Sequence, residues 1–177
     1  MKIGIDVGGT KCLGVAVDDD GKVVKQYRLP TPHADALCDT LVEIVAQLGE
    51  FNSIGIGVPG LISPEGVIRA SPNLVGAKEL ALRQMLEDRL GKKVLVENDA
   101  TCAALGEWSS GAAHGATDAW VITLGTGIGG GFISGSVLQR GAHGFAGEVG
   151  HMVVDPDGPL CPCGRNGCWE RYASGNG

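Results

Sequence analysis

Hydrophobic and polar positions alternate at the start of the chain. Ile3, Ile5 and Val7 are separated by small or polar residues, which predicts a β-strand. Similar patterns over 12–17 and 23–28 predict two more strands, and the turn signals between them leave no room for a helix. We therefore expect the chain to begin with a β-meander.

The period of the pattern changes at about residue 34. Leu37, Leu41, Ile44 and Leu48 fall on one face of an amphipathic helix, predicted over 34–48. A buried strand follows over 54–58 and ends at Pro59 and Gly60. Further along the chain the pattern predicts helices over 80–90 and 100–108, strands over 94–97, 120–124 and 132–133, and a glycine loop over 125–131.

A unit of strand, glycine turn and strand occurs twice, at residues 3–17 and 120–134. The repeat suggests two related lobes, each with a turn of a size that suits phosphate. The small and polar residues over 111–117 form a plausible hinge. We therefore expect one α/β lobe over 1–113, and the beginning of a second over 114–177.

Composition and charge argue against several classes of protein. Of 177 residues, 44% are hydrophobic and 30 are glycine, which excludes a disordered chain and suggests tight turns or backbone close to a ligand. The net charge of −6 argues against a nucleic-acid partner. No apolar run is long enough for a transmembrane helix and the N-terminus lacks a signal peptide, so we expect a cytoplasmic protein with no membrane partner.

The first glycine turn, between the strands 3–7 and 12–17, suits an anion. Backbone N–H groups of Gly8 and Gly9 can point at a phosphate, and Thr10 and Lys11 add a hydroxyl and a cation. Asp6 could orient hydrated Mg²⁺ beside that phosphate. The alternative is an ordinary hairpin turn.

The second glycine turn contains Gly125, Thr126, Gly127, Gly129 and Gly130. Its spacing satisfies the G-x-G-x-x-G pattern of a Rossmann site, but that site needs a helix directly after the turn. The strand-like residues 132–135 follow instead, so the Rossmann interpretation fails. Two hairpin phosphate loops suit a nucleoside triphosphate better.

A carboxylate and an amide lie at a predicted junction from strand to helix. Asp99 could accept the proton of an attacking hydroxyl, as a general base does in phosphoryl transfer. Asn98 could donate a hydrogen bond to a neutral polyol. The alternative role for the acid is that of a helix N-cap.

The most specific motif is rich in cysteine. His151, Cys161, Cys163 and Cys168 form the pattern H-x9-C-x-C-x4-C, a tetrahedral Cys₃His set for structural zinc. The alternative is a chance cluster of buried thiols. The other three cysteines lie in predicted elements and are interpreted as small core residues: Cys12, Cys38 and Cys102.

Two carboxylates flank this motif without belonging to its ligand set. Glu148 precedes the histidine by three residues, and Glu170 follows the last cysteine by two. Carboxylates suit sugar hydroxyls, which need charged acceptors. The alternative is that both are ordinary solvated surface acids.

Together these motifs resemble the bacterial ROK family of sugar kinases and repressors. They occur in the family's order along the chain and span it from end to end. The matching segments are 6–11, 57–60, 71–74, 97–100, 124–131, 147–151 and 161–170.

The resemblance implies an actin-like ATPase (ribonuclease H-like) fold with two lobes around a cleft. It implies Mg²⁺- and ATP-dependent phosphorylation of a hexose at its 6-hydroxyl. Residues 167–175 resemble the glucokinases of the family, so glucose is the leading substrate. N-acetylglucosamine and N-acetylmannosamine are the alternatives. Because the family commonly forms dimers, a homodimer is also expected.

The resemblance also assigns roles to individual residues. Asp99 matches the catalytic base and, with Asn98, Glu148, His151 and Glu170, the sugar-binding positions. The two glycine turns match the phosphate loops. The zinc ligands are matched by His151, Cys161, Cys163 and Cys168. One imidazole nitrogen can hold zinc while the other faces the sugar.

One departure from the family concerns length. Kinases of the family continue well past the cysteine-rich segment, whereas this sequence stops at Gly177. We therefore expect an incomplete second lobe, and a sugar- or zinc-binding fragment without turnover is the alternative function. The repressors carry a DNA-binding domain ahead of the first phosphate loop, which here begins at residue 6, so DNA binding is not expected.

Overall fold

The computed structural model describes residues 1–177, which divide into two compact units, Met1–Asp99 and Ala100–Gly177. The sequence suggested a boundary at residue 113. The observed division falls earlier because the helix α3 (Asp99–Ser110) packs on the sheet of the second unit, where Ala104 is fully buried. The assignment of a phosphate loop and site residues to each of two lobes, 1–113 and 114–177, stays a prediction.

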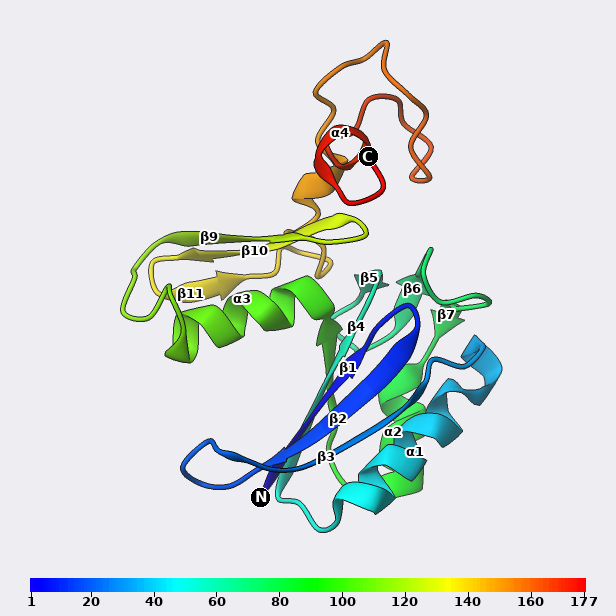
Figure 1. Cartoon of the computed structure of the whole chain (residues 1–177), viewed down its shortest axis with the longest axis vertical. Helices are drawn as coiled ribbons and strands as arrows, with labels where there is room; N and C mark the ends of the chain where they lie inside the picture. Colours follow the sequence, from blue (N-terminus) through cyan, green and yellow to red (C-terminus); the bar gives the residue numbers. More distant parts are fainter. The chain divides into compact units, whose positions relative to one another are not determined.

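A five-stranded mixed sheet forms the first unit, in the order β3-β2-β1-β4-β8 (Figure 1). The first three strands pair antiparallel, which confirms the predicted meander. The strands β4 and β8 add in parallel on the other side of β1. The bounds are β1 Lys2–Val7, β2 Lys11–Val17, β3 Val23–Pro30, β4 Ser53–Val58 and β8 Leu95–Asn98.

Two helices cover the same face of this sheet, α1 (Leu37–Leu48) and α2 (Leu82–Leu90) (Figure 1). A 3-10 turn, η1 (Ala34–Ala36), leads into α1. The predicted apolar face of α1 is buried, which removes its side chains from water and stabilises the unit. Gly14 of β2 allows the close approach of α1, since a Cβ there would overlap Ile44 and come within 2.9 Å of Leu48.

The parallel strands bring three chain positions into register at one edge of the sheet. Asp6 of β1 is paired with Gly57 of β4, and Gly57 is paired with Glu97 of β8. The carboxyl ends of parallel strands are where α/β sheets place ligands. This edge therefore gathers Asp6 with Asn98, the last residue of β8.

A second, small sheet in the first unit is absent from the sequence-based prediction. It consists of β5 (Leu61–Ile62), β6 (Ile68–Ala70) and β7 (Lys78–Leu80), paired antiparallel in that order. Strands of two or three residues are too short to show a period of alternation.

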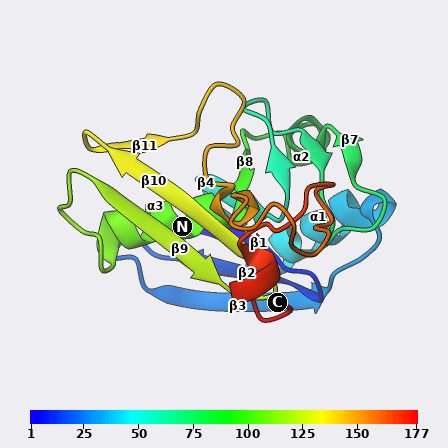
Figure 2. The same ribbon diagram turned by 90° about the horizontal axis from the view of Figure 1, so that it is seen from above.

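The second unit begins with α3 and a three-stranded antiparallel sheet in the order β11-β10-β9, whose strands lie side by side in Figure 2. The strands are β9 (Ala119–Leu124), β10 (Ile128–Ser134) and β11 (Val137–Gln139). Beyond them the regular elements are η2 (Val149–His151) and α4 (Glu170–Ala173).

The predicted glycine loop over 125–131 is wrong in its extent, because β10 already begins at Ile128. Only Gly125–Gly127 forms the turn. Gly129 and Gly131 lie in the strand and allow α3 to pack closely on it, since a Cβ on Gly129 would lie 2.6 Å from Ala100 and one on Gly131 would overlap Ala104. Helix packing, rather than turn formation, explains these glycines.

The internal repeat is confirmed at the level of topology, because both units contain a three-stranded meander with a glycine turn between its first two strands. The burial of equivalent positions differs. Ile3, Ile5 and Val7 of β1 are at most 3% exposed. Their equivalents in β9 are 54%, 37% and 68% exposed, in the order Trp120, Ile122, Leu124. Trp120 stacks on Phe132 with ring centroids 4.4 Å apart.

None of the helices combines the length and the apolar character that crossing a membrane requires.

We predict that Gly14→Ala lowers the free energy of unfolding by about 1–3 kcal/mol, because the added methyl group overpacks the interface between β2 and α1. Urea denaturation of the purified variant measures the change. Gly55→Ala in β4 is the matched control, since a Cβ there meets no atom within 4 Å. Equal effects of the two substitutions would contradict the packing argument.

Candidate functional site

The first glycine turn is a tight hairpin, and hydrogen bonds from Thr31, a residue outside the turn, stabilise it. The Gly8 N–H donates to the Lys11 carbonyl at 2.9 Å. Thr31, after β3, donates its hydroxyl to the Gly8 carbonyl at 2.6 Å and its N–H to the Thr10 carbonyl at 3.1 Å. These bonds use carbonyl groups of the turn as acceptors, so they fix its shape without engaging the N–H of Gly9, beside which a Cβ would meet open space.

Asp6, one residue before the end of β1, interacts electrostatically with Asp99 and Lys11. Although its side chain is exposed in part, loss of solvent raises the pKa of the Asp6 carboxyl. The negative charge of Asp99 raises this pKa further, and the Lys11 ammonium opposes the rise. Two carboxylates close enough to interact form a place that favours a cation.

Asn98 fixes the start of α3. Its side-chain amide donates to the Gly60 carbonyl at 3.2 Å and to Asp99 Oδ1 at 3.1 Å. Its own backbone N–H donates to Glu97 Oε1 at 3.1 Å. The Asp99 carboxylate is thereby oriented by a neighbour that also ties it to the loop after β4.

The second glycine turn is closed by the Gly125 N–H, which donates to the Gly127 carbonyl at 3.0 Å. Gly129 and Gly130 lie beyond it in β10. The turn itself therefore consists of Gly125, Thr126 and Gly127. Phosphate binding by any of these residues stays a prediction.

The four residues of the cysteine-rich motif meet in space. One ligand atom from each of His151, Cys161, Cys163 and Cys168 lies within 4.8 Å of the others. Cys163 Sγ is 3.5 Å from Cys168 Sγ, and Cys161 Sγ is 3.6 Å from His151 Nδ1. Ligand atoms of a tetrahedral zinc site with Zn–S bonds of about 2.3 Å lie about 3.5–3.8 Å apart. The donor set and its spacing therefore fit zinc.

Two thiols of this cluster, those of Cys161 and Cys168, have a raised pKa and need a cation to ionise, whereas at Cys163 hydrogen bonds outweigh burial and lower the pKa. Burial raises the pKa of Cys161 to about 12, and hydrogen bonding with the side chains of Cys163, Cys168 and Glu170 adds to the rise. A metal ion stabilises the thiolate form of such a group. The cluster has the chemistry of a metal centre rather than of a reactive cysteine.

His151 presents its two ring nitrogens to different partners. Nδ1 faces Cys161 and lies 3.6 Å from Glu170 Oε1, while Nε2 lies 3.8 Å from Glu148 Oε2. If Nδ1 binds a metal, Nε2 stays available for a second partner. The division of roles between the two nitrogens, one toward zinc and one toward the sugar, stays a prediction.

Gly147 and Gly150 position this segment and were not assigned a role from the sequence. A Cβ on Gly147 would overlap the Gly130 carbonyl, and one on Gly150 would overlap the Ile128 carbonyl. Both glycines therefore let the segment around Glu148 lie directly on β10. The spacing G-x-x-G around a carboxylate was the available signal. The Gly60 carbonyl, which accepts from Asn98, had no signal in the sequence.

The site residues fall into two groups, one in each unit. The first unit contains the first glycine turn, Asp6, Asn98 and Asp99, and the second contains the second glycine turn, Glu148, Glu170 and the Cys₃His cluster. Within each group the structure brings the predicted residues together. Their individual roles stay predictions.

Comparison with known proteins identifies a family. The ROK family profile matches residues 2–177. A glucokinase of Streptomyces coelicolor is 42% identical over 180 residues, covering 99% of this chain and 56% of the relative. An N-acetylmannosamine kinase of Citrobacter koseri is 39% identical over 180 residues, covering 99% and 62%. The chain thus spans little more than half the length of these relatives.

The fold is similar to that of a solved relative. The crystal structure of a ROK family glucokinase from Streptomyces griseus, in complex with glucose and AMPPNP, superposes with a TM-score of 0.89 at 42% sequence identity. The superposed region covers 98% of this chain and 57% of the Streptomyces griseus glucokinase chain. The predicted actin-like ATPase fold is confirmed. The chain belongs to the ROK family.

Proposed function

We propose that the protein is a hexose kinase, which transfers the γ-phosphoryl group of ATP to the 6-hydroxyl of glucose. The observation that carries this proposal is the geometry of Asp99, oriented by Asn98 at the ligand-binding edge of the sheet and close enough to Asp6 to affect its pKa. The similarity to glucokinases, one of them in complex with glucose and AMPPNP, supports the choice of substrates.

Asp99 acts as the general base in this proposal. Its carboxylate accepts the proton of the sugar 6-hydroxyl as that oxygen forms a bond to the γ-phosphorus. The bond from the γ-phosphorus to the bridging oxygen breaks, and the electron pair leaves with ADP. The hydrogen bond from Asn98 to Asp99 Oδ1 holds one carboxylate oxygen and thereby orients the carboxylate.

The glycine turns bind the phosphate groups of ATP. The Gly8 and Gly125 N–H groups donate within their own turns, so the Gly9 N–H and the hydroxyl and ammonium groups of Thr10 and Lys11 are the groups that neutralise negative charge on the transferring group. Mg²⁺, when bound, would be held on the side of Asp6 and would neutralise charge on the phosphate oxygens. The mutual effect of Asp6 and Asp99 supports a cation there.

Charged and polar side chains in each group of site residues have the chemistry to bind a sugar. Asn98 and Asp99 belong to the first unit, and Glu148, His151 and Glu170 belong to the second. Carboxylates accept strong hydrogen bonds from hydroxyl groups. A zinc ion in the Cys₃His cluster would have a structural role, fixing the orientation and tautomer of His151.

The kinase reaction is tested by ADP release from the purified 177-residue chain with Mg-ATP and a panel of hexoses. We expect release that depends on glucose, and a loss of at least about 100-fold in Asp99→Asn, because general-base catalysis contributes about 10²–10⁴-fold. Glucose binding, followed by the fluorescence of Trp169 next to Glu170, should persist in this variant.

Three other results would count against the proposal in different ways. Release that depends on N-acetylmannosamine instead of glucose would contradict the substrate. Equal release by Asp99→Asn would contradict the base. Glucose binding by a folded chain without ADP release would contradict the kinase and support a sugar-binding role without turnover.

We predict that Asp6→Asn stabilises the protein slightly at pH 7. Because the pKa of Asp6 is raised in the folded state, its ionised form costs stability above that pKa, and the cost disappears as the pH falls toward the ordinary value of about 3.9. Thermal unfolding without added Mg²⁺ should show a Tm higher by about 1–3 °C at pH 7 and no difference near pH 3.5. Asp20→Asn in the exposed β2–β3 turn is the control, and a lower Tm for Asp6→Asn at pH 7 would contradict the argument.

We predict that the chain binds one zinc ion and that Cys161→Ser weakens this binding by more than about 100-fold, since it removes one of four ligands. Competition with a chromophoric chelator measures the affinity, and the charge-transfer absorbance of bound Co²⁺ reports the number of thiolate ligands. Cys102→Ser, outside the cluster, should bind zinc as the wild type does. Wild-type protein that binds no zinc would exclude the metal centre.

A further inference from the structure

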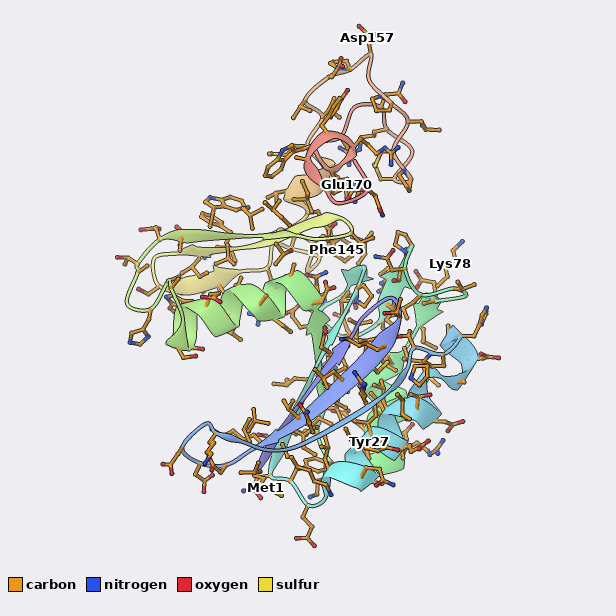
Figure 3. The ribbon with its side chains drawn as sticks, in the orientation of Figure 1. Met1, Tyr27, Lys78, Phe145, Asp157 and Glu170 are labelled. Atoms are coloured by element: carbon orange, nitrogen blue, oxygen red, sulfur yellow. The ribbon has the colours of Figure 1, made fainter.

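Glu170 contacts both the Cys₃His cluster and the second glycine turn. Its Oε1 lies 3.6 Å from His151 Nδ1 and accepts from Cys161 Sγ at 3.5 Å. Its Oε2 accepts the backbone N–H of Ile128, the first residue after the turn, at 3.3 Å. Figure 3 labels this side chain near α4. One carboxylate therefore joins two parts of the second unit that have different chemical roles.

The segment around α4 contacts the second glycine turn at another point. The Gly175 N–H donates to the Gly125 carbonyl at 2.7 Å. Gly127 permits the approach of the carboxylate on the other side, because a Cβ there would lie 2.9 Å from Glu170 Oε2. The two bonds hold the turn at both of its ends.

The position of this segment depends on the cluster. Glu170 follows Cys168 by two residues, and the intervening Trp169 donates its N–H to the Met152 carbonyl at 2.8 Å, beside His151. Cys168 and His151 are both members of the cluster. An ion that binds these two residues would fix the chain on either side of Glu170.

We propose that Glu170 is a positioning residue for the second glycine turn, and that it couples metal binding at the Cys₃His cluster to the order of this turn. This inference rests on the proposed function only in that the turn is taken to bind phosphate. The bond from the Ile128 N–H to a carboxylate is charge-assisted, so its loss removes one of the two bonds that hold the turn from outside. By linkage, a substitution that disorders the turn should also weaken the affinity of the cluster for metal.

Hydrogen exchange of the Ile128 amide tests the coupling without nucleotide or turnover. In the zinc-loaded chain we expect this amide to exchange about ten- to a hundred-fold more slowly than in the chelator-treated chain. Glu170→Ala, which removes the acceptor of the Ile128 N–H, should lose most of this protection with zinc still bound. Tyr172→Phe, which removes an exposed hydrogen bond from α4 to Asp155, is the control and should keep it.

The reciprocal test starts from the turn. Gly127→Ala places a methyl group against the Glu170 carboxylate, and we expect it to weaken zinc binding by about three- to tenfold in chelator competition. Gly125→Ala is the matched control in the same turn, because a Cβ there meets no atom within 4 Å, and its zinc affinity should equal that of the wild type. This pair does not alter the cluster, so it also tests the coupling if Glu170→Ala fails to fold.

Two results would overturn the coupling. One is unchanged protection of Ile128 in zinc-loaded Glu170→Ala, and the other is equal zinc affinity of Gly127→Ala and Gly125→Ala. Neither result depends on ADP release. An inactive chain that shows the expected exchange and zinc affinities would contradict the proposed kinase and leave the coupling supported.

Discussion

The second unit depends on the meeting of one histidine and three cysteines. Beyond β11 its regular elements are the three residues of η2 and the four of α4, and its buried apolar cluster consists of Ala104, Ile133 and Leu138. So small a core contributes little to the order of residues 140–177. A metal ion held by the four ligand atoms, which lie within 4.8 Å of one another, would provide the constraint that a larger core supplies elsewhere, as structural metal sites do in small domains.

The sequence predicted the larger elements because their periods are long enough to detect. Strand alternation over 3–7 and the helical face of Leu37, Leu41 and Ile44 both reappear as buried positions. It missed β5 to β7, which have two or three residues each. It also placed Gly129 and Gly131 in a loop, because glycine has low strand propensity and the packing of α3 that requires glycine is tertiary.

The sequence allowed the residues of the candidate site to be identified, but not the contacts that they make with one another. Carboxylates, glycines and the Cys₃His spacing were visible in the sequence. The effect of Asp99 on Asp6 needs the pairing of β1, β4 and β8, since these residues are far apart along the chain. The contact of Glu170 with the Ile128 amide likewise comes from folding back over more than forty positions, for which no local pattern exists.

The uneven burial of the two meanders has a consequence for the behaviour of the protein in solution. Strand β9 pairs with β10 alone, and Trp120, Ile122 and Leu124 remain exposed on one of its faces. A strand with a free edge and an apolar face is a template onto which another strand can add. Protein concentration, rather than temperature alone, therefore becomes a condition that decides whether this chain stays monodisperse.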